Sequence, residues 1–462
     1  MKNLVFSIMS MQSVNPSNNQ IIQVFEPHSE DYVQAAMERA DLQFSTWKNE
    51  SFEYRAQLFN KLANVLEERK NSLAEIMTLE MGKLTAEGLA EVEKCALVCR
   101  YYADNAEKFL KDEILKSDHS KAFISYHPLG TILAVMPWNF PLWQVFRFAA
   151  PTLMAGNVGL LKHASNVQMC AQAIEDVFIE AGFPNGAFQN LRIGSDKVEA
   201  IINDDRIKAV TLTGSEGAGS AVASVAGSKI KKSVLELGGS DPFIVLDNAD
   251  MGLAVRTAVK ARMRNCGQSC IAAKRFIVVE RVYDEFVEKF SSFLQALKLG
   301  DPSDILTSCG PMASEDLANE LLKQVNESVE MGAKVVLGGK RPEREGAYFE
   351  PTILADLKPG MPAYEEELFG PVASLFKVKN EEEAIALANN SKFGLGASIW
   401  TQDLVRGEMI ARKIESGAVF VNHMVSSDPR LPFGGIKTSG YGRELSHLGI
   451  REFMNTKTIA IN

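Results

Sequence analysis

The 462-residue sequence has few cysteines, no long apolar run and no excess of positive charge. Six cysteines in so long a chain are not a disulfide framework, so we expect a reducing compartment, the cytoplasm. No stretch approaches the roughly 18 apolar residues that a membrane-spanning helix needs. A net charge of -9 argues against the basic surface that sequence-independent nucleic-acid binding requires. These absences predict a soluble globular protein that binds neither nucleic acid nor a membrane.

The sequence also lacks the signals of a structural metal site and of a signal peptide. The six histidines are scattered, and Cys95 and Cys99 have no second pair at ligand spacing, so we expect no structural metal. The first residues carry one positive charge and a short apolar run without a cleavage site, which is not typical of a signal peptide. Met9 or Met11 is an alternative start of the chain.

A chain of this length predicts two or three domains. Apolar residues recur at helical spacing through residues 32–47, 53–72 and 73–109, and Gly82 and Gly88 predict a break in the third stretch. Residues 122–127 alternate as a strand. The tail, residues 457–461, also has the pattern of a strand. This strand is isolated from the other predicted strands, so we expect it not to pair within its own domain but to extend a partner subunit's sheet in a homodimer or homotetramer.

From Thr131 onward, short apolar strands alternate with helices, which predicts an α/β fold with a parallel sheet covered on both faces. Such sheets bind ligands at the carboxyl ends of their strands. The first series has strands at residues 132–136, 158–162, 187–191 and 209–213. A second series between residues 243 and 421 predicts a second α/β domain.

Cys270 is the central candidate for chemistry. A buried cysteine is usually inert packing, but Cys270 follows small and polar residues and directly precedes a strand-like run at residues 275–279. Glu236, between two leucines and before two glycines, is a candidate general base because apolar surroundings raise a carboxyl pKa. The alternative for Glu236 is a carboxylate satisfied by backbone donors.

Other candidates follow the predicted strands. Asn139, between two prolines, is held rigidly as a donor for a developing oxyanion or is part of a rigid turn. Lys162 binds a ribose or phosphate or is a solvated loop lysine. Gly214 and Ser215 open a helix with a glycine-rich turn, a natural phosphate site whose pattern alone is weak.

The order and spacing of these motifs are more specific than any one of them. Taken together, the motifs resemble the aldehyde dehydrogenase superfamily over nearly the whole chain. They are, in order, Pro-Trp-Asn-Phe-Pro at 137–141, Gly214-Ser215, Glu-Leu-Gly-Gly at 236–239, Gly-Gln-Ser-Cys at 267–270, Glu-Leu-Phe-Gly-Pro at 367–371 and Pro-Phe-Gly-Gly at 432–435.

The resemblance implies roles for three residues. Cys270 matches the nucleophile whose thiolate attacks the aldehyde carbon. Asn139, with the Cys270 backbone N–H, matches the oxyanion site of the thiohemiacetal. Hydride transfer to a nicotinamide then leaves a thioester, and Glu236 matches the base that activates water to hydrolyse it.

The resemblance also implies a cofactor site for NAD or NADP. NAD-preferring members have glutamate where this chain has Ser165, and His163 replaces a proline; a glutamate would repel a 2′-phosphate and serine would not. Either cofactor is therefore expected. The matching residues are Lys162 for the adenine ribose, Gly214 and Ser215 for the pyrophosphate, and Glu367, Phe369 and Trp138 around the nicotinamide ribose and ring.

The fold implied is a Rossmann-like cofactor domain, an α/β catalytic domain and a small β oligomerisation flap. We assign residues 1–112 and 132–236 to the first, 237–445 to the second, and 113–131 and 446–462 to the flap.

Two arginines indicate the substrate class. An average arginine is structural or on the surface, but Arg147 and Arg264 match the paired arginines of succinate-semialdehyde dehydrogenases, and Ser427 approximately matches a serine with the same task. A guanidinium suits a carboxylate. The resemblance thus implies a short ω-carboxylate aldehyde, succinate semialdehyde first.

Alternatives remain at this point: glutarate semialdehyde or unspecific aldehydes as substrate, a catalytically idle family member, and a hydrolase that uses Cys270 without a cofactor. Cys266, four residues before Cys270, is either a small packing residue or the partner of Cys270 in a reversible protective disulfide.

Overall fold

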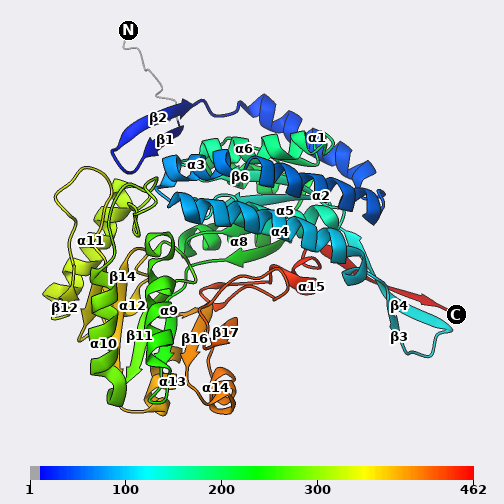
Figure 1. Cartoon of the computed structure of the whole chain (residues 1–462). Coiled ribbons are helices and arrows are strands. Elements are labelled where there is room, and N and C mark those ends of the chain that lie inside the picture. The colour runs from blue at the N-terminus through cyan, green and yellow to red at the C-terminus, as the bar shows by residue number, and fades with distance from the viewer. Residues whose placement is uncertain (1–10) are drawn as a thin grey trace, which may run out of the picture.

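The computed structural model describes residues 11–462, which form two large sheets, a helical layer and a small projecting sheet (Figure 1). The helical layer and the first large sheet make up the upper part of Figure 1, and the second large sheet lies below them. Among the described residues, no helix is both long and apolar enough to cross a membrane.

The helical layer contains four helices and a hairpin. The helices are α1 (Glu30–Trp47), α2 (Phe52–Glu68), α3 (Lys70–Met81) and α4 (Thr85–Phe109), so the predicted helices are present. Ser29 and Ser51 cap α1 and α2 by accepting backbone N–H bonds, as serine does at helix starts. Gly82, at φ 72°, ends α3, but Gly88 lies inside α4. The hairpin β1 (Met11–Asn15) and β2 (Gln20–Phe25) was not predicted.

Gly88 continues the helix because its missing side chain makes room for α3. A Cβ at Gly88 would lie 3.1 Å from both Cα and Cβ of Ala74. The predicted break at Gly88 is therefore wrong: this glycine serves the contact between two helices and does not end either of them.

The first large sheet has the order β19-β9-β8-β5-β6-β7, parallel except for β19, as the alternating pattern predicts. Its strands are β5 (Thr131–Met136), β6 (Val158–His163), β7 (Phe188–Asn190), β8 (Ile207–Thr213), β9 (Lys232–Glu236) and β19 (Gly440–Tyr441). The intervening helices are α5 (Trp143–Met154), α6 (Gln168–Glu180), the 3-10 turn η1 (Ser195–Lys197), α7 (Val198–Asn203) and α8 (Glu216–Ser228).

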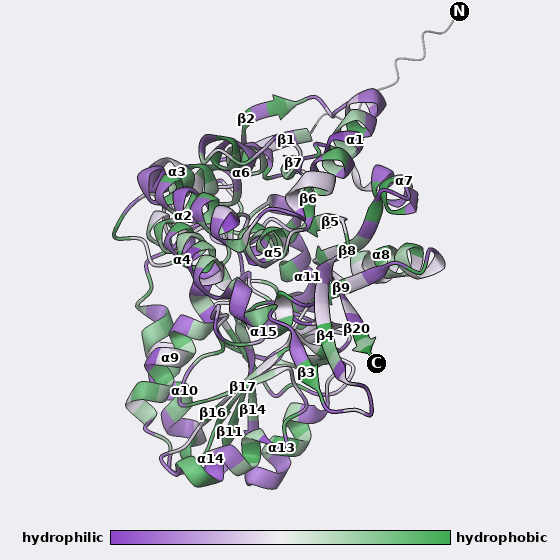
Figure 2. Ribbon diagram, turned by 90° about the vertical axis from the view of Figure 1, so that its right-hand side faces the viewer, coloured by the Kyte–Doolittle hydropathy of each residue, from purple (hydrophilic) through white to green (hydrophobic). Residues whose placement is uncertain are grey.

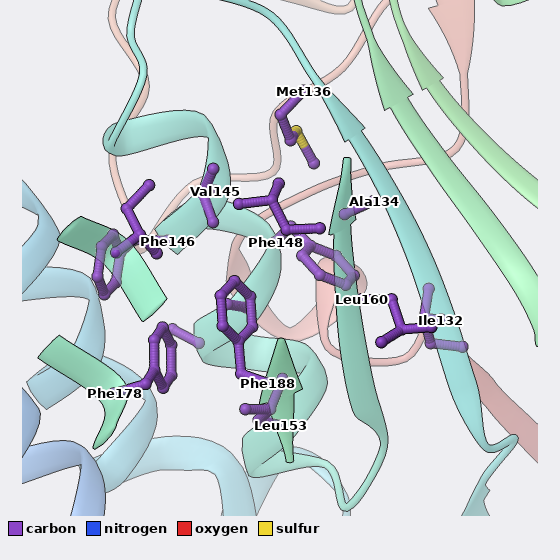
Figure 3. Close-up of a cluster of buried hydrophobic side chains, with 14 of the residues drawn as sticks. Ile132, Ala134, Met136, Val145, Phe146, Phe148, Leu153, Leu160, Phe178 and Phe188 are labelled. Carbon is purple, nitrogen blue, oxygen red and sulfur yellow. The ribbon is translucent and has the colours of Figure 1, made fainter. Parts of the chain in front are cut away.

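A stack of phenylalanines fills the core between this sheet and its helices (Figure 3). Phe178 of α6 stacks on Phe188 of β7 with ring centroids 4.3 Å apart and on Phe146 of α5 at 5.6 Å. All three side chains are buried. The stack joins α5 to the sheet, and α5 is the helix that follows the Asn139 turn.

The second large sheet has the order β12-β13-β14-β11-β10-β16-β17, with only β12 antiparallel to its neighbour. Its strands are β10 (Asp241–Val245), β11 (Ala273–Val279), β12 (Lys334–Leu337), β13 (Thr352–Ala355), β14 (Val372–Val378), β16 (Gly396–Trp400) and β17 (Ala418–Val421). The helices are α9 (Met251–Met263), α10 (Glu280–Gln295), α11 (Glu315–Glu330), α12 (Pro362–Glu365), α13 (Glu381–Asn389) and α14 (Leu404–Ala411). Two short strands, β15 (Phe393–Gly394) and β18 (Ile436–Lys437), pair beside it.

The helices over this sheet are amphipathic, and α10 shows both purple and green segments in Figure 2. Phe286, Phe290 and Leu294 of α10 lie at helical spacing on its buried face. This face packs the helix against the second sheet, which holds the strand that follows Cys270.

The projecting sheet has the order β20-β4-β3, with β3 (Glu113–Leu115), β4 (Lys121–Pro128) and β20 (Met454–Ile461), preceded by α15 (Ser446–Gly449). It extends from the body, with the C-terminus at its tip (Figure 1). The tail strand was expected to be isolated within its own chain, and this is wrong: β20 pairs along its length with β4. The two segments of the predicted flap thus form one sheet.

We predict that Phe178→Ala lowers stability by about 3–5 kcal/mol, because it leaves a cavity in the phenylalanine stack. The shift in the thermal unfolding midpoint measures this effect. Phe293, which is 46% exposed on α10, is the matched control. Equal shifts for Phe178→Ala and Phe293→Ala would contradict the packing role.

Candidate active site

The segment before Cys270 has unusual backbone geometry. It begins with η2 (Arg264–Gly267), in which Asn265 and Cys266 have φ values of 52° and 54° and Gly267 has 73°. Non-glycine residues with positive φ are uncommon and cluster at functional sites. A Cβ at Gly267 would lie 2.2 Å from the carbonyl oxygen of Gly370, so only glycine fits there. This backbone places Cys270 immediately before β11.

Side chains from other elements hold this strained segment. Both carboxylate oxygens of Glu87 on α4 accept the Asn265 backbone N–H, at 3.0 and 3.1 Å. The Asn265 amide Nδ2 donates to the carbonyl oxygens of Asn139 and Gln268, at 2.8 and 3.1 Å. These bonds offset the cost of the backbone conformation and tie the Cys270 loop to the Asn139 turn.

Cys270 lies between two cavities. One, of about 270 Å³, is lined by most of the predicted cofactor residues together with Asn139 and Glu236: Trp138, Gly214, Ser215, Glu367 and Phe369. The other is a narrow cavity of about 20 Å³ lined by Cys270 and by the three predicted substrate residues Arg147, Arg264 and Ser427. All residues predicted for the site, except Lys162 and Ser165, therefore line one or the other of these two cavities, and Cys270 lines both.

The narrow cavity leads toward a wider one of about 560 Å³. The two have Lys94, Phe140, Trp143 and Arg264 as common lining residues. Trp143 and Phe140 thus line the path as well as packing against the core. The wide cavity therefore adjoins the narrow cavity that Cys270 lines.

Glu236 ends β9 and is buried beside an arginine. Its Oε2 accepts a bond of 3.2 Å from Arg147 Nη2, and Arg147 Nε lies 2.7 Å from Glu444 Oε2 as an ion pair without hydrogen-bond alignment. Burial raises the pKa of Glu236, and Arg147 partly opposes this. Burial also raises the pKa of Glu444, to about 7. Glu236 Oε1 has no partner within residues 11–462, so it is free to accept a proton.

The surroundings of Cys270 favour the thiol over the thiolate. Burial raises its pKa, and the neighbouring Glu236 carboxylate raises it further, while Arg147 and Lys274 oppose both effects. A thiol of this kind needs a base to become a nucleophile, and Glu236 is the adjacent carboxylate. The pair is suited to proton transfer from sulfur to carboxylate.

Asn139 is held from behind by residues that sequence analysis missed. Its carbonyl oxygen accepts a bond of 3.0 Å from Lys83 Nζ, and Lys83 forms a buried ion pair with Glu91. Glu91 Oε1 accepts the backbone N–H groups of Leu142 and Trp143 at the start of α5, both at 2.9 Å. The Asn139 amide Nδ2 donates to Gln268 at 3.2 Å, and its second N–H remains for a ligand in the cavity.

The signal for these residues was present in α4. Glu87, Glu91 and Lys94 lie at positions i, i+4 and i+7, on one face of the helix. They border the wide cavity instead of bulk solvent. The sequence signal is that these three charged residues recur at helical spacing on the same face of α4.

Glu367 and Phe369 lie on the cofactor side of Cys270. Glu367 Oε1 pairs with Lys274 Nζ at 2.9 Å and accepts the Gly239 N–H at 3.2 Å. The Phe369 ring meets Trp138 edge to face, with centroids 5.7 Å apart. Lys274, also missed from the sequence, donates to the carbonyl oxygen of Cys270 at 2.8 Å and so fixes the loop end.

The remaining cofactor candidates follow β6 and β8. Ser215 caps α8 by accepting the Ala218 N–H, which leaves other N–H groups of this 13-residue helix start for an anion. Lys162 is partly buried at the end of β6, and burial lowers its pKa. His163 donates from Nε2 to the Pro141 carbonyl at 2.9 Å, and burial lowers its pKa to about 4, so it is a neutral packing residue.

Cys266 does not face the nucleophile. Its Sγ lies 3.5 Å from Cys309 Sγ, and it contacts the Gly310 carbonyl oxygen at 3.3 Å. Of the two alternatives for Cys266, its burial against Cys309 supports the packing residue over a partner of Cys270. Cys95 and Cys99 are buried in the helical core.

We predict that Glu236→Gln lowers the pH midpoint of Cys270 alkylation, because it removes the negative charge that raises the thiol pKa. Iodoacetamide labelling across pH, followed by peptide mass spectrometry at Cys270, measures the midpoint. Glu175→Gln, a half-buried carboxylate on α6, is the control and should leave it unchanged. A midpoint that stays or rises in Glu236→Gln would contradict the coupling.

Comparison with known proteins gives a consistent answer. The sequence model described as "Aldehyde dehydrogenase family" matches residues 7–459. A protein of Synechocystis named "Probable succinate-semialdehyde dehydrogenase [NADP(+)]" is 54% identical, over 98% of this chain and 100% of that protein. "Succinate-semialdehyde dehydrogenase [NADP(+)] 1" of Mycobacterium tuberculosis is 52% identical, with the same coverage.

Solved structures agree. The structure of Gox0499, studied for cofactor and substrate selection, has a TM-score of 0.97 at 44% identity and covers 98% of this chain and 100% of its own. Succinic semialdehyde dehydrogenase from Streptococcus pyogenes, in complex with NADP+, has a TM-score of 0.96 at 41% identity, over 98% of this chain and 99% of that one. This chain therefore belongs to the aldehyde dehydrogenase family.

Proposed function

We propose that this chain oxidises succinate semialdehyde to succinate with NADP, and also accepts NAD. The observation that carries the proposal is that Cys270 lines both a cavity of about 270 Å³ and a narrow cavity lined by two arginines. The names of the relatives from Synechocystis and Mycobacterium tuberculosis support both the substrate and the cofactor.

The proposed chemistry begins with proton transfer from Cys270 Sγ to Glu236. The thiolate then attacks the aldehyde carbon to form a thiohemiacetal. Its oxyanion is stabilised by the Asn139 amide and the Cys270 backbone N–H. Such donors act in a site whose surroundings exclude water, so their electrostatic effect is large.

NADP, when bound, supplies the acceptor for the hydride. The first cavity fits such a group because it combines the free N–H groups at the start of α8 with the Glu367 carboxylate and the Phe369 ring. The acyl group then remains on Cys270 as a thioester. Glu236 releases the Cys270 proton to solvent and then takes a proton from the water that attacks the thioester, so that the carboxylic acid forms and Cys270 leaves as the thiolate. Its partner Arg147 keeps the Glu236 carboxylate oriented toward the thioester.

The substrate carboxylate is proposed to bind at the narrow cavity. Arg264 lines it and has no carboxylate partner within residues 11–462; its guanidinium lies 5.5 Å from the centre of the Phe140 ring. Arg147 lines the same cavity, but two of its nitrogens are engaged by Glu236 and Glu444. A free guanidinium in a partly apolar cavity favours a carboxylate over a neutral chain end. Glutarate semialdehyde is the alternative substrate with the same end group.

The wider organisation is proposed from the same resemblance. Residues 1–112 and 132–236 form the cofactor domain, 237–445 the catalytic domain, and 113–131 with 446–462 the flap. We propose a homodimer or homotetramer built on the flap, whose edge strands β3 and β20 leave Ile114 and Ile461 exposed. We also propose the cytoplasm as the location, since all six cysteines are free thiols.

We predict that Arg264→Ala lowers kcat/KM for succinate semialdehyde roughly 10- to 150-fold. The reason is that the substrate carboxylate loses one charge-assisted hydrogen-bonding partner, which contributes about 1.5–3 kcal/mol. Initial rates of NADPH formation with succinate semialdehyde and with butanal measure it. Butanal has no carboxylate, so its kcat/KM should stay nearly the same. Unchanged turnover of succinate semialdehyde would refute the carboxylate site.

We predict that Ser165→Glu lowers kcat/KM for NADP at least tenfold, because a carboxylate there repels the 2′-phosphate. The value for NAD should hold or improve, since the new carboxylate can bind a ribose 2′-hydroxyl. Ser165→Ala, which adds no charge, is the control. An equal loss with both cofactors would show that Ser165 does not lie at the 2′-position.

A further inference from the structure

Lys94 lines the narrow cavity together with Arg147 and Arg264, and the proposed mechanism gives it no role. It lies on α4, on the same helical face as Glu87 and Glu91. Lys94 lines both the narrow cavity, beside Cys270, and the wide cavity. An aldehyde that enters by the wide cavity and reaches Cys270 therefore passes this side chain.

The ammonium of Lys94 is held in place by two partners. Its Nζ donates to Ser427 Oγ at 2.6 Å and lies 4.0 Å from the centre of the Trp143 ring, a cation–π contact. Trp143 Nε1 donates to the same Ser427 Oγ at 3.1 Å. Because a serine oxygen accepts two hydrogen bonds, both of its acceptor positions are filled. The Ser427 hydroxyl proton is then left as a donor for another acceptor.

No carboxylate within residues 11–462 forms an ion pair with Lys94 or with Arg264, although acidic groups lie nearby. Glu91 is paired with Lys83, and Asp428 with Arg430. Arg147 is satisfied by Glu236 and Glu444. The narrow cavity thus contains two uncompensated cations and one hydroxyl donor, a set that an anionic ligand would complete.

We propose that Lys94 is a specificity-determining residue, and that its ammonium binds the substrate carboxylate together with the Arg264 guanidinium and the Ser427 hydroxyl. In this assignment Arg147 is a positioning residue that orients Glu236. The inference rests on the proposed oxidation of a carboxylate-bearing aldehyde and deepens it. It makes α4, a helix outside both large sheets, part of the substrate site.

The charge state of Lys94 gives the assignment a pH signature. Burial, with Arg264 and Arg147, lowers the pKa of Lys94 to about 7, while Cys95 and Glu91 oppose the shift. The other charged group facing it is Asp428, which is paired with Arg430. The free enzyme holds Lys94 protonated below pH 7 and neutral above it. Preference for the carboxylate substrate should therefore fall as pH rises through 7.

The test compares kcat/KM for succinate semialdehyde with kcat/KM for butanal, with NADP, in the wild type and in Lys94→Met. We expect the ratio to drop about 10- to 150-fold in Lys94→Met, mainly through KM for succinate semialdehyde, with butanal little changed. Lys94→Arg, which keeps the charge, should retain most of the preference. Lys260→Met is the matched control, because Lys260 lines only the wide cavity and is exposed.

An unchanged ratio in Lys94→Met, or an equal loss with both substrates, would overturn the assignment. The wild type also tests it without any substitution: its ratio should fall between pH 6 and pH 9, and a flat ratio would overturn the assignment even where Lys94→Met fails to fold. Titrations of Cys270 and Glu236 affect both substrates and cancel in the ratio. A wild type that turns over butanal as well as succinate semialdehyde would instead refute the proposed function itself.

Discussion

Arg147 occupies the position on which the arrangement of the site depends. Its guanidinium lies between two buried carboxylates, Glu236 at the end of β9 and Glu444 after β19, and rests 4.6 Å from the Phe433 ring centre. Burying one such charge alone is costly, but removing one member of a buried group is costlier, because it leaves its partner uncompensated. The proposed general base, Glu236, and the Arg147 guanidinium beside it are therefore fixed together.

The same interaction explains how separate parts of the chain meet at one sulfur. Arg147 comes from α5, whose start is held by Glu91 of α4, and Glu444 comes from a segment far along the chain that returns to pair β19 with β9. The cavity of about 270 Å³ lies at the carboxyl ends of strands of the first sheet, and the cavity of about 20 Å³ is lined by residues of α4, α5 and η2. Cys270 lines both cavities, so the sulfur is within reach of each of them.

Sequence alone predicted the alternation of strands and helices, and it singled out residues that follow strand ends, such as Asn139 and Ser215. These positions are local: a strand that stops and a turn that follows can be recognised without a partner. Lys83, Glu91, Lys94 and Lys274 were missed because their importance depends on what packs opposite them. The spacing of Glu87, Glu91 and Lys94 shows that they share one face of α4, but the sequence does not show that this face borders a cavity. The partner of Cys266 could not be found without knowing where Cys309 lies.

The projecting sheet has a consequence for the order of folding. Its central strand β4 is made early in synthesis, whereas β20, which pairs with it over eight residues, follows both large sheets in the sequence. Everything between them, including most of both large sheets, must be synthesised first. Contacts of such long sequence separation form late, and an unpaired strand edge invites wrong pairings while it waits. The projecting sheet can therefore close only after both large sheets have been synthesised, and the edge of β4 stays open to wrong pairing during that time.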